Sequence, residues 1–322
     1  MASDTGRVLV FGSFTLIATC FLVATALMAA VVLTALLTGW IGGDAARTRA
    51  FGVGGALATV GIALLMVPLI GRFSHLGDEV RMLELCDPGA PLLRELMERA
   101  GGTYNHSIMA GALAEAAARA IGANAPLARV GAYYHDIGKL ARPQFFAENQ
   151  MGLRNPHDGA PPAQSAFIIT AHVREGVELA EREGLPGPIV DIIAQHHGTS
   201  LVTYFYRKAT AGGAQVDEAA FRYEGVPPRT REAALVMLAD AAEAIARGLA
   251  DPGPAQIEAA VRKVVAMKEN DGQLSSSGMS EEDIEATVVS YAKMLAGLRH
   301  ARVDYPDDAE GDPYAGHSEL EP

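Results

Sequence analysis

The sequence predicts an all-α protein in which a pair of transmembrane helices precedes a soluble helical bundle. The distribution of charge is the first reason for this prediction. The first 77 of the 322 residues hold only six charged side chains, whereas the other 245 hold 22 basic and 36 acidic ones. Helical spacing of the apolar residues in the second part is the second reason, and no strand-like alternation runs far there. One end of the chain therefore suits lipid and the other suits water.

The membrane region is predicted at residues 1–77, with spans at about residues 8–41 and 50–71. Residues 8–43 carry no charged side chain, and the second run has about the length of one span. Roughly 20 apolar residues cross a bilayer as a helix, so the first run forms one long or tilted span. Its apolar core is also far longer than the roughly 7–15 residues of a cleaved signal peptide.

The basic residues around the two spans predict their orientation. Arg7, Arg72 and Arg81 lie on the side of the two ends, and Arg47 and Arg49 lie in the short loop between the spans. This excess of arginine favours the cytoplasm for both ends. We therefore expect a multi-pass protein of the cell (inner) membrane, with its soluble part in the cytoplasm and the lipid bilayer as a partner.

The soluble part is predicted to consist of helices separated by breaks rich in Gly and Pro. Residues 78–101 form a connector and a first helix, residues 102–306 form the main helical domain, and residues 307–322 form a disordered acidic tail. Apolar residues at helical spacing predict helices at residues 107–121, 125–134, 163–182, 187–194, 229–248, 255–268 and 281–298.

Composition excludes some classes of function. The soluble part carries a net charge of −14, which argues against binding DNA or RNA through a broad basic surface. Cys20 and Cys86 are the two cysteines, too few for a disulfide framework or a cysteine-based zinc motif. The sequence leaves a homo-oligomer open.

Histidine and aspartate residues in the predicted helices suggest a metal centre. His106 opens a helix, His135 and Asp136 stand together in HDIGK, and His196 and His197 are paired in QHHG. Imidazole and carboxylate together suit Fe, Mn, Co, Ni or Zn, whereas Mg or Ca prefers oxygen alone. Five imidazoles and two carboxylates are too many for one metal and suit two if one carboxylate bridges. The candidate ligands are His106, His135, Asp136, His172, His196, His197 and Asp240.

Two basic residues follow the HD pair. Lys139 comes three residues after Asp136, on the same face if the helix continues, where it could neutralise a phosphate oxygen. Arg142 is a second candidate for a substrate contact. Both are also compatible with plain surface residues, since a cation is favoured at the C-terminus of a helix. The remaining histidines, His75, His157, His300 and His317, are interpreted as residues without a role in the site.

These motifs resemble the HD-domain metal-dependent phosphohydrolases. The resemblance is closer to one branch, the membrane-anchored seven-helix HD phosphodiesterases that hydrolyse cyclic di-AMP. It covers essentially residues 78–306, through stretches such as LARVGAYYHDIGKLARPQFFAENQ, IIAQHHGTSLVTYFYRKA and FRYEGVPPRTREAALVMLADAAEA. The resemblance thus implies an HD-domain helical bundle behind the two transmembrane helices.

The resemblance also implies how the ligands divide between two divalent transition metals, with iron or manganese as the usual pair. One metal would take His106, His135, Asp136 and Asp240, and the other would take three histidines with Asp136 as the bridge. Lys139 would match the family's phosphate-contacting lysine, and Asp136 would be catalytic as well as a ligand. The three histidines of the second metal would be His172, His196 and His197.

The implied activity is the metal-dependent hydrolysis of cyclic di-AMP to linear pApA. Cyclic di-GMP is less favoured, because the branch that cleaves it carries a GYP signature after its paired histidines and this chain has QHHGTSLV. The alternatives are an HD phosphohydrolase acting on cyclic di-GMP or mononucleotides, and a membrane receptor that senses a nucleotide without cutting it.

Two features depart from the family. Its members usually have seven membrane helices and a large extracytoplasmic domain, and this chain looks like the last part of such a protein. Asn105 stands where relatives often have a second histidine, and the matching ligand is the next residue, His106.

Overall fold

The computed structural model describes residues 81–299, apart from residues 151, 153, 212 and 214, together with Leu33 and Gly55. The chain divides into two compact units, Met1–Glu84 and Leu85–Pro322, and the second contains the elements described here. Apart from Leu33 and Gly55, the spans predicted at residues 8–41 and 50–71 and the tail predicted at residues 307–322 lie outside the described residues. In the part that is described, no helix has both the length and the apolar character to span a bilayer.

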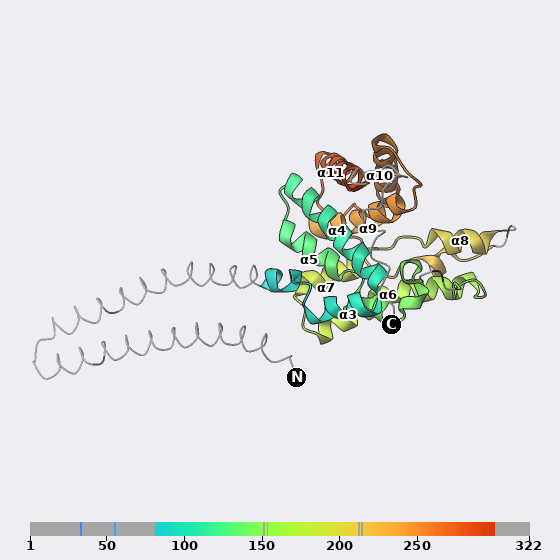
Figure 1. The fold of residues 1–322 in the computed structure, drawn as a ribbon, viewed down its shortest axis with the longest axis horizontal. Coiled ribbons are helices and arrows are strands. Elements are labelled where there is room, and N and C mark those ends of the chain that lie inside the picture. The colour runs from blue at the N-terminus through green and yellow to red at the C-terminus, as the bar shows by residue number, and fades with distance from the viewer. Residues whose placement is uncertain are drawn as a thin grey trace, which may run out of the picture. The chain divides into compact units, whose positions relative to one another are not determined.

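Helices account for the regular structure of the described part (Figure 1), which confirms the all-α prediction for these residues. The strand-type pairing found among them is an isolated antiparallel bridge between Leu201 and Arg222. Short 3-10 turns η1 (Ile137–Ala141), η2 (Pro143–Phe145), η3 (Ala147–Asn149) and η4 (Glu218–Phe221) join longer helices. These are α3 (Pro91–Arg99), α4 (Gly101–Ala120), α5 (Ala125–Tyr134), α6 (Pro162–Arg182), α7 (Gly187–Gln195), α8 (Thr203–Thr210), α9 (Arg231–Arg247), α10 (Pro254–Asn270) and α11 (Glu281–Arg299).

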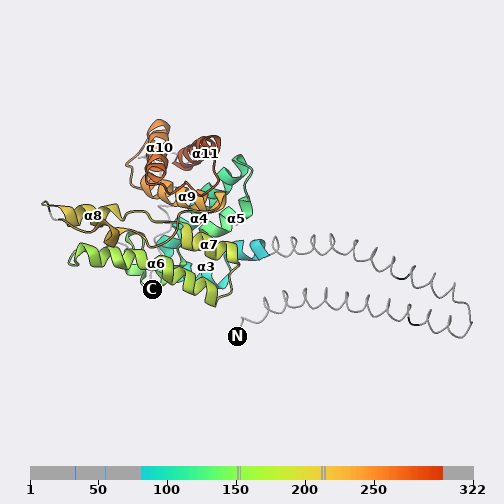
Figure 2. The same ribbon diagram turned by 180° about the vertical axis from the view of Figure 1, so that it is seen from behind.

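Helix α4 is central to the bundle. It packs against α3, α5, α9 and α11, and α10 packs against both α9 and α11. Figures 1 and 2 show the α10–α11 pair at one end of the bundle and α3 and α6 at the other. The core between α4, α5 and α9 is rich in alanine, as at Ala110, Ala128 and Ala239, each fully buried. Small side chains let these helices approach closely, so the metal-binding candidates they carry can meet.

Local signals explain where two of these helices begin. The side chain of Asn124 accepts a hydrogen bond from the amide of Leu127 and caps α5, and Thr230 caps α9 in the same way through Ala233. The prediction for α4 began six residues late, at residue 107 rather than Gly101. Its first turn is held from a distance, because Asn149 accepts a hydrogen bond from the amide of Thr103 at 3.0 Å. A cap 46 residues away leaves no local mark in the sequence.

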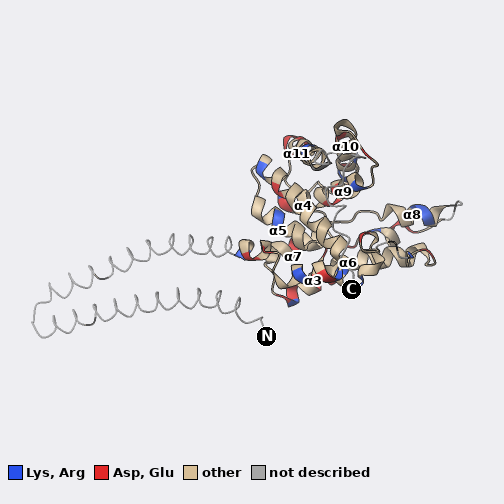
Figure 3. Cartoon of the chain, viewed as in Figure 1, with Lys and Arg blue, Asp and Glu red and all other residues tan. Residues whose placement is uncertain are grey.

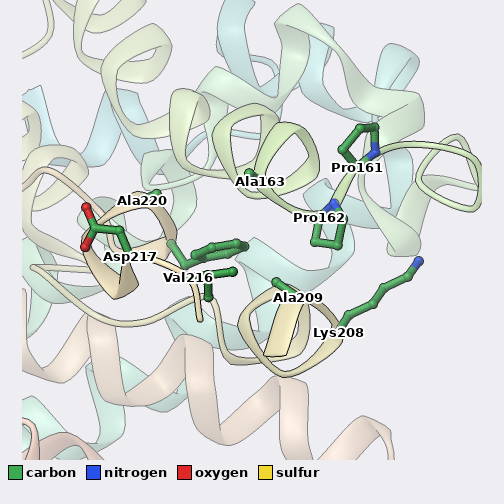
Figure 4. A pocket seen from close by; sticks show the side chains of 9 residues that line it. Pro161, Pro162, Ala163, Lys208, Ala209, Val216, Asp217 and Ala220 are labelled. Atoms are coloured by element: carbon green, nitrogen blue, oxygen red, sulfur yellow. The ribbon is translucent and has the colours of Figure 1, made fainter. Parts of the chain in front are cut away.

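Side chains of both charge signs are interspersed along the described helices (Figure 3). A cavity of about 530 Å³ lies between the start of α6, helix α8 and η4. Pro162, Ala209 and Val216 are among the residues around it (Figure 4). None of the seven predicted metal ligands lines this cavity, so it is separate from the centre described next.

Candidate metal centre

Asp136 lies at the middle of a buried cluster of histidines. Helix α5 ends at Tyr134, and Asp136 follows as the residue that precedes η1. One carboxylate oxygen, Oδ2, lies 3.1 Å from Nε2 of His135 and 3.9 Å from Nε2 of His106. The other, Oδ1, lies 3.2 Å from Nε2 of His172 and 3.7 Å from Nε2 of His196. The carboxylate thus faces two sets of imidazoles, one with each oxygen.

Asp240 of α9 lies against both sets. Its Oδ1 is 3.0 Å from Nε2 of His106, and its Oδ2 is 3.6 Å from Nδ1 of His197. The structure therefore brings all seven predicted ligands together, although they come from three helices (α4, α6 and α9) and from the segments that follow α5 and α7. Two groups have ligand atoms close enough to share an ion, namely His106, His135 and Asp136, and Asp136, His172, His196 and His197.

The glycine of HDIGK allows this convergence. A Cβ added at Gly138 would lie 1.9 Å from the backbone oxygen of His172 and 2.5 Å from the backbone nitrogen of Gly176. Any side chain at residue 138 would therefore push η1 away from α6. The contact keeps Asp136, two residues before this glycine, beside the histidine that α6 provides.

Four of the histidines are oriented by a hydrogen bond on the ring nitrogen that faces away from Asp136. Nδ1 donates to the carbonyl three residues earlier in His135 (2.6 Å), His172 (2.6 Å) and His196 (2.7 Å). In His106, Nδ1 is bonded at 2.6 Å to the carboxylate of Glu243. With Nδ1 engaged in this way, the lone pair of Nε2 points into the cluster, as in histidines that bind metals.

The buried polar atoms at the middle of the cluster fit a bound cation. Nε2 of His135 and both carboxylate oxygens of Asp136 are buried and lack a hydrogen-bond partner among the described residues, apart from an ionic contact with Lys139. Leaving such atoms unpaired is costly, and a cation would satisfy all three at once. The donor set of imidazole nitrogen and carboxylate oxygen suits a divalent transition metal.

Burial and neighbouring charges set the protonation of the cluster. Burial lowers the pKa of His196 to about 3, with a further lowering by His135 and His172. Burial and His196 likewise hold the pKa of His197 well below its usual value. Burial would raise the pKa of Asp136, but His135 and Lys139 outweigh it and hold that pKa well below the usual range. Neutral imidazoles and an ionised carboxylate are the forms that ligate metals.

His106 differs from the other histidines. Burial alone would lower its pKa, but hydrogen bonds to Asp240 and Glu243 raise the pKa to about 10. Without a metal the two carboxylates thus favour a second proton on His106, and a cation bound at Nε2 would replace that proton.

The two predicted substrate contacts have different surroundings. Nζ of Lys139 lies 2.6 Å from Oδ2 of Asp136 and 2.7 Å from Oε1 of Glu148, so this lysine lies at the edge of the cluster. The guanidinium of Arg142 is partly exposed and pairs with Glu175 of α6. No ion pair or hydrogen bond joins Arg142 to the seven candidate ligands in the part of the chain that the structure describes.

The segment that follows the paired histidines is held by the loop after α10. Gln273 is fully buried; its Oε1 accepts a hydrogen bond from the amide of Thr199 at 3.0 Å, and its Nε2 donates to the hydroxyl of Thr199 at 2.9 Å. Gly198 has a φ of +53°, and a Cβ there would lie 2.2 Å from Oε1 of Gln273. The glycine of QHHG thus provides both the turn and the room for this contact.

Sequence reasoning missed Glu243, Glu148, Tyr223 and Gln273. Glu243 left a usable signal, because it follows Asp240 by three residues and so lies on the same face of α9. The other three reach the cluster from loops and 3-10 turns, where no periodicity indicates direction. His157, interpreted as having no role, is buried and lies 3.0 Å from the backbone oxygen of Phe145 through its Nε2.

Comparison with known proteins agrees with this geometry. The family model of the HD domain matches residues 103–245, which include all seven candidate ligands. A solved HD domain is 41% identical to this chain, which covers 99% of it with a TM-score of 0.63. The chain therefore belongs to the HD-domain phosphohydrolase family.

Within this family the chain is similar to cyclic-di-AMP phosphodiesterases named PgpH. It is 41% identical to PgpH of Bacillus subtilis over 256 residues and 40% identical to PgpH of Listeria monocytogenes over 259 residues. Each match covers 80% of this chain and 36% of the relative, so the chain spans little more than a third of the length of these relatives. The solved domain mentioned above is the HD domain of PgpH from L. monocytogenes. A second structure of it, in complex with cyclic-di-AMP, matches 66% of this chain and all of that domain, with a TM-score of 0.64.

Proposed function

We propose that this protein is a metal-dependent phosphodiesterase that hydrolyses cyclic di-AMP to linear pApA at a centre of two metals. The observation that carries the proposal is the carboxylate of Asp136, which faces histidines with each of its oxygens inside a buried cluster. The similarity to a PgpH HD domain solved with cyclic-di-AMP supports the choice of substrate.

The candidate ligands divide into two sets around Asp136. His106, His135 and Asp240 would hold one cation together with Asp136, and the three remaining histidines would hold the second with Asp136 as the shared ligand. We infer iron or manganese as the metal pair. When bound, two such cations lower the pKa of water and stabilise negative charge on phosphoryl oxygens. The histidines of the second set are His172, His196 and His197.

Lys139 would contact the phosphate of the substrate. Its ammonium has three protons to donate, and the carboxylates of Asp136 and Glu148 account for two of them. The same two carboxylates outweigh the effect of burial and raise the pKa of Lys139 above its usual value, so the group stays charged. The remaining proton can then be donated to a phosphoryl oxygen as negative charge develops there.

A turnover assay with the full chain, purified in detergent and reconstituted with manganese, tests the proposal. The substrates are cyclic di-AMP, cyclic di-GMP and 5′-mononucleotides. We expect cyclic di-AMP to be cleaved fastest, with pApA as the product. Faster turnover of another nucleotide would contradict the substrate, and tight binding of cyclic di-AMP without turnover would favour a receptor instead.

We further propose that the protein lies in the cell (inner) membrane through residues 8–41 and 50–71, with the HD domain in the cytoplasm. The uncharged runs and the arginines at their ends support this. A membrane-impermeant maleimide should label an Ala45→Cys variant in intact cells, because residue 45 lies in the loop between the spans. Labelling only after permeabilisation would instead place residue 45 in the cytoplasm and contradict the proposed orientation. Cross-linking in the membrane would test for a homo-oligomer.

A further inference from the structure

Tyr223 contacts the centre without having been assigned to it. Its ring is stacked on the ring of His197, with centroids 4.2 Å apart and an angle of 27° between the planes. It also meets His172 edge to face at 5.9 Å. Its amide donates a hydrogen bond to the carbonyl of Ser200 at 3.1 Å, which anchors the backbone beside the paired histidines. The side chain is thus fixed against two of the candidate ligands.

The hydroxyl of Tyr223 belongs to a ring that packs against two histidines of the centre. An ordinary tyrosine is already protonated at neutral pH, so this hydroxyl is a donor there. Within the described residues the bond found for Tyr223 is that of its amide, so its hydroxyl is not engaged there, and the residue is only half-buried. A donor without a protein partner is available to a ligand.

We propose that Tyr223 is a substrate contact whose hydroxyl donates a hydrogen bond to a non-bridging oxygen of the scissile phosphate, beside Lys139. The inference rests on the proposed phosphodiester hydrolysis and adds a residue to it. A phosphate oxygen fits better than a nucleobase, because His197 already occupies one face of the ring. Lys139 lies 5.0 Å from the ring centroid of Phe146, and the rings of Phe146 and Tyr223 both meet His172 edge to face, so an anionic group bound beside His172 could contact both Lys139 and Tyr223.

The competing role is structural. Tyr223 could act only through its ring, by holding His197 in place for a metal. The variant Tyr223→Phe separates the two roles, because it keeps the ring and its stacking but removes the hydroxyl. Tyr204→Phe is the matched control, since Tyr204 is 69% exposed on α8 and makes no contact with the cluster in the described structure.

The experiment compares the full chain and the two variants in detergent, each reconstituted with manganese. Three quantities are measured, namely kcat and KM for cyclic di-AMP, the manganese content per chain, and the dissociation constant of the product pApA by calorimetry. For Tyr223→Phe we expect kcat to fall about 10-fold to 100-fold, as for loss of a hydrogen bond to a charged group. We expect weaker binding of pApA and an unchanged manganese content. Tyr204→Phe should match the parent protein.

Two results would overturn the inference. One is a Tyr223→Phe variant with the kcat of the parent protein. The other is a fall in kcat that is matched by a loss of manganese, which would place the effect on His197 rather than on substrate. Failure of the parent protein to cleave cyclic di-AMP would instead contradict the proposed function, so the two failures are distinguishable.

Discussion

The two halves of the candidate centre are built differently around the same carboxylate. On one side, His106 is bonded to Asp240 and Glu243, and these carboxylates raise its pKa to about 10. On the other side, His196 is buried and His197 is half-buried among histidines, and the pKa of His196 is lowered to about 3. The first half is thus strongly anionic and already attracts a positive charge, whereas the second offers neutral nitrogen ligands.

The orienting contacts of the two halves also differ at one ligand, His106, because His135 of the first half donates to a backbone carbonyl as the histidines of the second half do. The Nδ1 atoms of His172 and His196 donate to backbone carbonyls, which no substitution can remove. Nδ1 of His106 depends on the side chain of Glu243. In the second half the supporting side chain is that of Gln273, which holds the segment after His197 through Thr199. Each half therefore has its own supporting residue that mutation can change.

The largest expected effect comes from Asp136, which serves both halves. Asp136→Asn keeps the size of the side chain but removes the charge that both sets of imidazoles face. We expect cyclic di-AMP hydrolysis to fall by more than about 10³-fold and both metals to be lost. Elemental analysis beside the turnover assay measures both. Asp191→Asn on α7 is a control for the same chemical change. An Asp136→Asn variant with normal metal content and activity would contradict the role of this residue.

Glu243→Gln should weaken only the half that contains His106. Glutamine can still accept a hydrogen bond from Nδ1, but the negative charge that supports the ligand is gone. Residues that orient a metal ligand in this way are typically worth about 10-fold to 100-fold in metal affinity. A manganese titration should show one weakened site and one site like that of the parent protein. Equal weakening of both sites would mean that the halves are not independent.

Gln273→Leu should act on the other half. The substitution leaves the amide and the hydroxyl of Thr199 without their partner inside the protein. We expect the free energy of unfolding to fall by about 1–3 kcal/mol, as for a buried hydrogen bond that loses one partner. We also expect about 10-fold weaker binding at the site of His197, with the site of His106 unchanged. Denaturant unfolding measures the free energy of unfolding, and manganese titration measures the affinity of each site. A variant identical to the parent protein in both would contradict this prediction.

The smallest effect is expected for Arg142→Ala, which touches neither half. Arg142 is partly exposed and paired with Glu175, and such pairs contribute about 0.2–1 kcal/mol. If its guanidinium also meets the substrate, as predicted from the sequence, KM for cyclic di-AMP should rise a few-fold while kcat and metal content stay constant. Steady-state kinetics check this, and a change in kcat alone would argue against a role in substrate binding.

Much of the fold could be predicted because its signals are local. The bounds of α5 were predicted at residues 125–134, since Asn124 caps its start and the apolar spacing ends with it. The start of α4 could not be predicted from the sequence, because the residue that caps it, Asn149, lies in a distant part of the chain. His106 therefore lies inside its helix rather than at the first turn, although it still reaches Asp136.

The candidate site divides in the same way. The seven ligand candidates could be named from residue types and from the family resemblance, and the structure places them in one cluster. The contacts that support these ligands could not be predicted, since Gln273 and Tyr223 lie in loops after α10 and η4, where no periodicity indicates direction. Glu243 is the exception, because helical spacing from Asp240 would have placed it on the same face.

The most direct test of the central claim is the manganese stoichiometry of the full chain after reconstitution, with variants that change one half at a time. The account predicts about two ions per chain in the parent protein, and about one in each of His106→Ala and His197→Ala. A parent protein that binds no manganese, or two ions that persist when both of these histidines are replaced, would contradict it.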